Sequence, residues 1–289
     1  MEEFTFTGLG TKWSVAVDGK QLEDRVRKAV VEYVQDFENR FSRFLPHSEV
    51  NAFREASAGE YMLSQEFSLL LARADRLRVL TAGAYDPAVA SVLEEAGYGA
   101  QHGLAPLKKN EKSRVSSWSL AGDKLTIGGP MAFDLGGIGK GYCIDRVAEI
   151  VKNAGYEYYL VDGGGDMAGA TKADGSAWRV AVEYPGKPDM AASVVNLKHQ
   201  GIAVSDVFRR RFGKWHHLID IQEKKPVEKV IGCVAVAQDA WSADCMTSGL
   251  FFTPLRNYPA LAEEFRASYL VFQSDGTAIV GPDWSGELL

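Results

Sequence analysis

A cluster of glycines near the middle of the chain limits most strongly what this sequence can fold into. Four glycines fall within residues 136–141, and glycine lets a backbone turn tightly and approach a ligand closely. Lys140 adds a positive charge inside this turn, and the amphipathic segment that follows, ending at Gly155, predicts a helix. Free backbone amides at a helix start attract anions, so the segment predicts a phosphate site.

Two widespread nucleotide-binding motifs do not account for these glycines. A P-loop requires a hydroxyl residue after Gly-Lys and a glycine five positions before that pair, but here Gly141 follows Lys140 and Asp134 occupies the first position. A Rossmann fingerprint matches the spacing of Gly163, Gly165 and Ala168, yet residues 169–175 predict a turn where that motif requires a helix. The sequence therefore indicates a phosphate site of another kind.

The composition is that of a globular protein and narrows the range of partners. The chain has 289 residues, of which 46% are hydrophobic and 24% charged, enough for a large core. A net charge of −6 argues against nucleic acid, which proteins bind with clustered Lys and Arg, and the basic run at 209–211 is short. The three cysteines are far apart in apolar surroundings, which predicts buried free thiols.

Neither a membrane helix nor a targeting segment is predicted. The longest nearly apolar run, 230–237, is far shorter than the ~20 residues that span a bilayer. Residues 1–6 lack the basic start and apolar core of a signal peptide, and no lipid-anchor cysteine follows. We therefore expect a cytoplasmic protein.

Helices and strands are mixed without a regular βαβ rhythm, which favours an α+β fold. Apolar residues at helical spacing predict a long helix over 21–43, a second from Ser64 to Thr81 and a third over 241–252. Alternation predicts strands at 4–6, 13–17, 158–161, 178–184, 200–205 and 230–237, and a final hairpin of 269–273 with 277–280. We expect one domain over residues 1–289, with two lobes around a cleft as one arrangement of it.

Several segments, taken together, resemble the signatures of the ApbE-type FAD:protein FMN transferases. They lie at residues 41–49, 83–87, 134–141, 145–146, 164–166, 217–220 and 243–248, in the family's order and spacing. The resemblance covers the chain from about residue 5 to 255 and implies an α+β fold related to the tunnelling fold. It also implies FAD as substrate, with Mg²⁺ on the pyrophosphate. The FMN half would pass through a phosphoester bond to a Ser or Thr hydroxyl of an acceptor flavoprotein, releasing AMP.

The resemblance assigns FAD contacts along the whole chain. The aromatic residue that stacks on the flavin is Phe44 here, where the family usually has Tyr, and a phenyl ring keeps the stacking face. Two residues have implied catalytic roles: Lys140 would neutralise charge on the phosphate, and His217 would accept the proton of the incoming hydroxyl or else position the flavin or phosphate. The full set of implied contacts is Leu9, Gly10, Thr11, Phe44, Ala84, Tyr85, Asp86, Asp134, Lys140, His217 and Leu218.

The resemblance also implies a metal site. Its ligands map to the carbonyl of Gly137, the carboxylate of Asp244 and the hydroxyl of Ser248, which are hard oxygen donors of the type that Mg²⁺ prefers. Asp244 and Ser248 are four residues apart on a predicted helix, so both lie on one face. Thr247 is an alternative hydroxyl, and capping of the helix start is a competing role for this segment.

Three positions depart from the family pattern. Asp220 is followed by residues 221–226 in place of a proline and a Thr-Gly turn, Asp162 replaces a usual Asn, and Asp206 replaces a usual Gly. These changes bear on the transfer step more than on FAD or Mg²⁺ binding. Two alternatives therefore stay open: an FAD pyrophosphatase, in which water replaces the hydroxyl and gives FMN and AMP, and a non-catalytic FAD-binding protein.

Overall fold

The N-terminal residues form a tight antiparallel hairpin. In the computed structural model, which describes residues 1–99, 117–212 and 215–289, strands β1 (Glu2–Gly8) and β2 (Thr11–Val17) pair along their whole length. The two turn residues, Leu9 and Gly10, have positive φ values of 50° and 69°. Positive φ at both positions gives the turn the twist that suits a two-residue hairpin.

The chain divides into two compact units. Unit 1 comprises Met1–Asp36, Gly137–Arg209 and Glu228–Leu289, and unit 2 comprises Phe37–Gly136 and Arg210–Val227. Helix α1 (Asp24–Phe41) contains the boundary at residue 36 and corresponds to the long helix predicted over 21–43.

Unit 1 is built on an antiparallel sheet of eight strands in the order β1-β2-β6-β7-β10-β15-β16-β17. The strands after the hairpin are β6 (Tyr159–Gly163), β7 (Met167–Gly169), β10 (Gln200–Asp206), β15 (Val230–Ala237), β16 (Ser268–Gln273) and β17 (Ala278–Val280). A second sheet has the order β18-β9-β8, with β8 (Trp178–Tyr184), β9 (Lys187–Leu197) and β18 (Gly286–Leu288).

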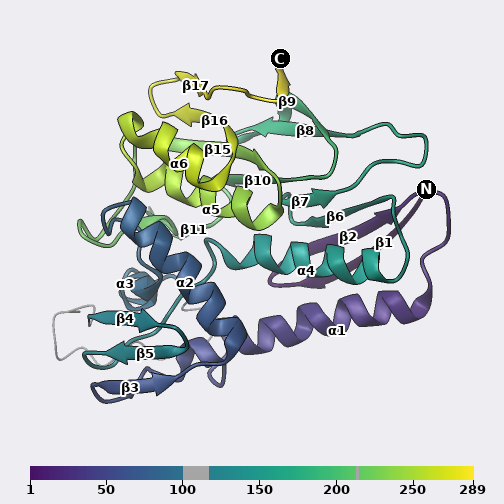
Figure 1. Cartoon of the computed structure of the whole chain (residues 1–289). Helices are drawn as coiled ribbons and strands as arrows, with labels where there is room; N and C mark the ends of the chain where they lie inside the picture. Colours follow the sequence, from purple (N-terminus) through teal and green to yellow (C-terminus); the bar gives the residue numbers. More distant parts are fainter. Residues whose placement is uncertain (100–116, 213–214) are drawn as a thin grey trace. The chain divides into compact units, whose positions relative to one another are not determined.

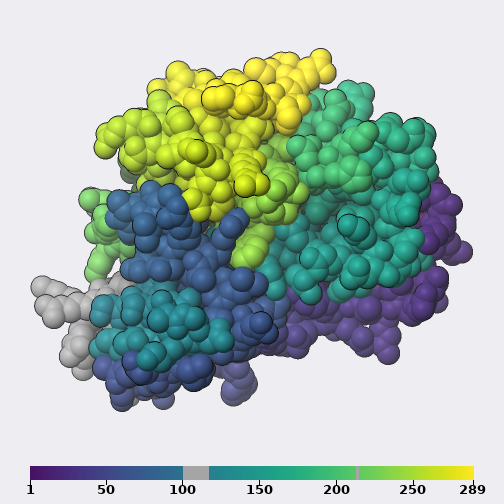
Figure 2. Space-filling view, viewed as in Figure 1, coloured from purple at the N-terminus to yellow at the C-terminus, as the bar shows by residue number. Residues whose placement is uncertain are grey.

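The core of unit 1 lies between these sheets and beneath three helices. Alternate residues of β8, including Val180 and Val182, pack with Ile202 of β10 and Val234 of β15 in one buried cluster. Helices α4 (Gly139–Asn153) and α5 (Ala240–Phe252) pack on the large sheet and on each other, followed by the 3-10 turn η4 (Leu255–Asn257) and α6 (Tyr258–Phe265) (Figure 1). The outer side of α6 lies at the surface, as Figure 2 shows.

The described residues of unit 2 include a small sheet, two helices and two short hairpins. Its sheet has the order β3-β5-β4, with β3 (Gly59–Met62), β4 (Trp118–Ala121) and β5 (Lys124–Ile127). The helical segments are α2 (Gln65–Leu80), α3 (Ala90–Glu95), η1 (Glu49–Asn51) and η2 (Pro87–Val89). The hairpins are β11 (Arg211–Phe212) with β12 (Trp215–His216), and β13 (Ile219–Asp220) with β14 (Lys225–Pro226).

Several sequence predictions are confirmed in detail. The hydroxyl of Ser64 caps α2 by accepting the Phe67 amide at 3.2 Å. All three cysteines are free and buried. Among the described residues, none of the helices combines the length and apolar character needed to span a bilayer.

Candidate functional site

The glycine turn brings the start of α4 into direct contact with α5. A Cβ at Gly141 would lie 2.4 Å from the carbonyl oxygen of Ala240 and 2.7 Å from Cβ of Asp244, so only glycine fits there. The Gly141 amide donates to Oδ2 of Asp244 at 2.8 Å. One of the free amides of the helix start thus serves a carboxylate of α5.

The oxygen donors predicted to hold a metal come together at this contact. Ser248 Oγ donates to the carbonyl oxygen of Gly137 at 2.5 Å, and Asp244 lies one turn earlier on the same face of α5. Asp244 and Ser248 are both buried, with 3% and 4% of their surface exposed. Thr247 is turned elsewhere, since its hydroxyl lies 3.0 Å from the Asp244 carbonyl and 3.2 Å from Ser205 Oγ. Ser248, rather than Thr247, is therefore the hydroxyl that lies beside Gly137.

This donor set fits a hard cation of the Mg²⁺ type. It combines a carbonyl, a hydroxyl and a carboxylate, all oxygen, and Mg²⁺ commonly completes such a set with water and substrate phosphate. The described part of the chain contains no group of three or more His, Cys, Asp or Glu side chains placed to hold a metal by themselves.

Lys140, at the start of α4, forms an ion pair with the buried carboxylate of Asp166. Its Nζ lies 2.5 Å from Oδ2 of Asp166, which is only 1% exposed, and Oδ1 of Asp166 accepts the Val204 amide at 2.8 Å. Asp162 shapes the turn before Asp166 by accepting the Gly165 amide at 2.8 Å. Burial raises the pKa of Asp162, and the nearby Asp166 adds to this effect. The replacement of Asn by Asp at 162 thus leaves an acceptor for this turn in place.

The β1–β2 hairpin lies against the turn between β6 and β7, which contains Gly164. A Cβ at Gly164 would meet Oγ1 of Thr11 at 2.3 Å, and Gly164 has a φ of +77° that other residues rarely adopt. Because β2 pairs with β6 from Trp13–Gly163 onward, Thr11 reaches the turn that carries Asp166. The structure thus places Thr11 and Lys140 beside one turn of unit 1.

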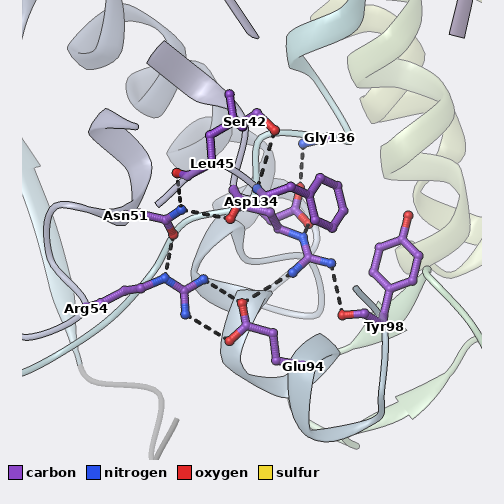
Figure 3. Close-up of polar contacts among 10 residues, drawn as sticks. Ser42, Leu45, Asn51, Arg54, Glu94, Tyr98, Asp134 and Gly136 are labelled. Atoms are coloured by element: carbon purple, nitrogen blue, oxygen red, sulfur yellow. Dashed lines mark hydrogen bonds and ion pairs between the residues drawn. The ribbon is translucent and has the colours of Figure 1, made fainter. Parts of the chain in front are cut away.

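In unit 2 a buried arginine, Arg43, contacts two of the residues predicted to bind FAD, Phe44 and Asp134. Figure 3 shows the polar contacts around Asp134 and Glu94. Only 3% of the Arg43 side chain is exposed. Nε lies 2.8 Å from Oδ2 of Asp134, and Nη1 lies 3.4 Å from Oε1 of Glu94. The guanidinium also stacks over the ring of Phe44, 4.3 Å from its centroid. Asp134, predicted to contact FAD, is therefore already engaged by Arg43 and by the Gly136 amide at 2.7 Å.

Tyr98 connects the aromatic residue and the histidine of the predicted site. Its ring packs edge-on against Phe44, with centroids 6.1 Å apart, and lies 6.3 Å from the ring of His217. Burial raises the pKa of the Tyr98 hydroxyl. Phe44 and His217 are far apart in the sequence, and both lie next to the ring of Tyr98.

The two adjacent histidines have different surroundings. His216 is buried, and its Nε2 lies 2.8 Å from the carbonyl oxygen of Val227, while its Nδ1 accepts the Leu218 amide at 3.3 Å. His217 is partly exposed, whereas Leu218 is buried. His216 thus has a structural role, and His217 is the more exposed of the two histidines.

The segment predicted to hold the adenosine end is well anchored. Oδ1 of Asp86 accepts the Ala88 amide at 2.8 Å and the indole N–H of Trp118 at 3.0 Å, and burial raises the pKa of Asp86. Ala84 and Tyr85 are buried just before it. The carbonyl of Ala84 accepts the Ile221 amide at 3.2 Å.

The loop at residues 220–226, which departs from the family pattern, forms hydrogen bonds within itself and to the segment around Ala82. Oδ1 of Asp220 accepts the amides of Gln222 and Glu223 at 2.8 and 3.1 Å. The side chain of Gln222 donates to the carbonyl of Ala82 at 2.7 Å. The carboxylate of Asp220 therefore organises a turn that lacks the usual proline and glycine.

Sequence reasoning missed the roles of Arg43, Glu94 and Asp166. Arg43 follows the apolar stripe of α1, but nothing in its neighbours distinguishes it from a surface arginine. Asp166 stands in one of the quoted signatures, yet only the fold shows that it pairs with Lys140.

The fold and the site together define an α+β protein with an oxygen-lined site at a glycine turn. The model of the ApbE family matches residues 9–271, and the chain belongs to this family. A relative from Haemophilus influenzae named FAD:protein FMN transferase is 30% identical over 84% of this chain and 74% of its own length. Another of the same name, from Escherichia coli K12, is 24% identical over 83% of this chain and 76% of its own.

Solved structures support the same fold. The flavin transferase ApbE from Vibrio cholerae superposes with a TM-score of 0.81 at 21% identity, covering 97% of both chains. The ApbE protein from Thermotoga maritima gives a TM-score of 0.83 at 22% identity, again over 97% of both chains. The expected α+β architecture is therefore confirmed.

Proposed function

We propose that this protein is an FAD:protein FMN transferase that moves the FMN half of FAD to a Ser or Thr hydroxyl of an acceptor flavoprotein and releases AMP. Membership of the ApbE family and the names of the curated relatives support the transfer. The observation that carries the proposal is the meeting of Asp244, Ser248 and Gly137 at the start of α4. These oxygen donors would suit a cation beside a turn whose free amides would attract phosphate.

Three residues would hold the cation: Gly137 through its carbonyl, Ser248 through its hydroxyl and Asp244 through its carboxylate. Mg²⁺ bound there would offset the negative charge of the pyrophosphate and polarise the bond to be broken. Lys140 would supply a second positive charge once its Nζ is shared between Asp166 and a phosphate oxygen.

The chemistry requires one bond exchange at phosphorus. The hydroxyl oxygen of the acceptor forms a bond to the FMN phosphorus, the bond to the AMP oxygen breaks, and the hydroxyl proton must leave. We assign the proton to His217, whose partial exposure allows contact with a substrate. Phe44 would stack on the flavin with the ring face that Arg43 does not cover, and Asp86 would serve the adenosine end.

The test is an incubation with FAD, Mg²⁺ and an acceptor flavoprotein. AMP release and covalent flavin on the acceptor, both followed by mass spectrometry, should appear together and in equal amounts. AMP with free FMN in the absence of acceptor would favour the pyrophosphatase. Binding of FAD without cleavage, across several acceptors, would favour the non-catalytic flavin-binding protein.

A further inference from the structure

Helix α5, which carries two of the proposed magnesium ligands, is anchored at its first turn by a carboxylate from another helix. Oδ1 of Asp145 accepts the Ala240 amide at 2.9 Å, and Oδ2 accepts the Trp241 amide at 2.8 Å. A helix start leaves four amides without partners inside the helix. The ordinary N-cap, Asp239, takes only the Ser242 amide through its side chain, at 2.6 Å. Asp145 therefore satisfies two amides that the N-cap side chain does not bind.

The contact between α4 and α5 is reciprocal. Gly141 and Asp145 are four residues apart on α4, and Ala240 and Asp244 are four residues apart on α5, so each pair lies on one helix face. At one end the Gly141 amide donates to Asp244, and at the other end Asp145 accepts the first amides of α5. The ring of Tyr142 packs edge-on against Trp241, with centroids 4.9 Å apart. About one turn of α4 and one turn of α5 are thus held in register by hydrogen bonds at both ends of the contact.

We propose that Asp145 is a positioning residue for the metal site: by holding the first turn of α5 on α4, it sets the place of Asp244 and Ser248 relative to Gly137. This inference rests on the proposed function, because the role of those three residues as magnesium ligands belongs to it. Asp145 does not touch the ligands and acts only through the helix.

The protonation state of Asp145 decides whether both bonds can form. An ionised carboxylate accepts at both oxygens, whereas the neutral acid carries a proton on one of them and accepts fully only at the other. Burial raises the pKa of Asp145 to about 7, and the two amide bonds oppose this shift. The charges of Asp239 at the α5 start and Glu149 on α4 make smaller contributions to this rise, and Tyr159 of β6 also faces the carboxylate.

The test compares Asp145→Asn with Glu149→Gln. The first keeps the size of the side chain but turns one acceptor into a donor. The second removes a carboxylate from an exposed position of the same helix, where it pairs with Arg146. Mg²⁺ binding is measured by calorimetry in the presence of ADP, which offers a pyrophosphate but no flavin to transfer. Hydrogen exchange of the Ala240 and Trp241 amides is measured without metal.

We expect Asp145→Asn to weaken Mg²⁺ binding by about tenfold, the lower end of what changes around metal ligands cost, and to speed exchange of both amides. The Mg²⁺ concentration for half-maximal transfer should rise in parallel, while the rate at saturating Mg²⁺ is retained. Glu149→Gln should neither weaken Mg²⁺ binding nor speed exchange of either amide, because loss of its charge lowers the pKa of Asp145 and so favours the ionised carboxylate. Wild-type Mg²⁺ affinity in Asp145→Asn would overturn the inference.

The same experiment also covers two other cases: a wild type that transfers no flavin, and an Asp145→Asn variant that does not fold. If the wild type binds Mg²⁺ with ADP but transfers no flavin, the proposed function fails while the weaker binding of Asp145→Asn still supports the inference. If Asp145→Asn does not fold, a pH series on the wild type decides. Amide protection of Ala240 and Trp241 and Mg²⁺ affinity should then fall together as the pH is lowered through about 7, and a loss of amide protection without a loss of Mg²⁺ affinity would overturn the inference.

Discussion

At the scale of single residues, Gly141 illustrates how a missing side chain sets the spacing of two helices. Glycine in a helix interior usually costs stability relative to alanine. Here the space that a Cβ would occupy is filled by the backbone of Ala240 and by Asp244, and backbone atoms cannot move away as a side chain can. The glycine is therefore required by the contact with α5, not only by the turn.

Gly141→Ala should lower the free energy of unfolding by about 1–3 kcal/mol, the usual cost of overpacking, despite the better helix propensity of alanine. Chemical denaturation measures this change. Gly59→Ala is the control, because the nearest atom to its Cβ would be 3.7 Å away and its φ is not positive. Equal stability of Gly141→Ala and wild type would show that α4 and α5 are not in close contact.

Asp244→Asn should abolish Mg²⁺-dependent FMN transfer while the protein stays folded. The amide keeps the shape of the side chain and an oxygen for the Gly141 amide, but it removes the charge that a cation needs. Asp239→Asn on the same helix removes the same charge, and Asn also serves well as an N-cap, so its activity should persist. If Asp244→Asn retained full activity at low Mg²⁺, its assignment as a ligand would be wrong.

Arg43→Met should lower stability by about 3 kcal/mol, because it leaves the partly buried carboxylate of Asp134 without its arginine, while Glu94 keeps its ion pair with Arg54. The matched change is Arg25→Met, which removes an exposed arginine paired with Glu23 and should cost less than about 1 kcal/mol. Urea denaturation of both variants compares the two costs. Similar small losses would mean that the charge network around Arg43 contributes little to stability.

At the scale of elements, the sequence predicted what depends on local periodicity. The strands expected at 178–184 and 230–237 are β8 and β15 with the same bounds, and the helix expected at 241–252 begins one residue earlier as α5. Strand β9 was missed, because its first five residues are exposed and include Pro188, which hides the alternation. The short helix α6 was missed as well, since only three of its residues are buried.

The partners of the site residues were not predictable from periodicity. Asp145 stands in one of the signature segments, but its bonds to α5 depend on the packing of α4. The same holds for Lys140 and Asp166, which only the sheet brings together. The family signatures identified the candidate residues, whereas the contacts among them became known only from the fold.

The pH dependence of stability should report the protonation of Asp145. Its pKa is about 7 in the folded protein and 3.8 as the reference value for an unperturbed Asp. The folded state therefore binds the proton more tightly. Protonation of Asp145 therefore stabilises the folded state. This contribution to the free energy of unfolding is fully present below the unfolded pKa of 3.8 and is lost as the pH rises through about 7, with a slope of at most about 1.4 kcal/mol per pH unit.

Urea denaturation between pH 4.5 and 8 checks this prediction. The stability of wild type relative to Asp145→Asn should decline as the pH rises across this range, because Asn does not titrate. A constant difference between the two proteins would show that the bonds to Ala240 and Trp241 keep the carboxylate ionised throughout.

At the scale of the whole molecule, strand pairing places residues of distant segments together. Pairing of β2 with β6 sets Thr11 beside the turn of Gly164, and the packing of α4 on α5 sets Gly137 beside Ser248. In unit 2, Tyr98 is the common neighbour of Phe44 and His217. The residues predicted to contact FAD thus come from segments that are far apart in the sequence, and binding of FAD is expected to stabilise the folded protein.

Ligand-linked stability can separate the flavin contacts from the nucleotide contacts. A ligand at 100 times its Kd stabilises a folded protein by about 2.7 kcal/mol, and FAD should raise the melting temperature more than ADP at equal concentration because ADP has no flavin to stack. Phe44→Leu should remove about 0.5–1.5 kcal/mol of the stabilisation by FAD, the contribution of a stacked aromatic pair, and leave that by ADP unchanged. Phe6→Leu, on strand β1, is the control and should preserve the difference between the two ligands. An undiminished difference in Phe44→Leu would assign Phe44 to packing alone, against Arg43 and Tyr98, and would require another residue to stack on the flavin.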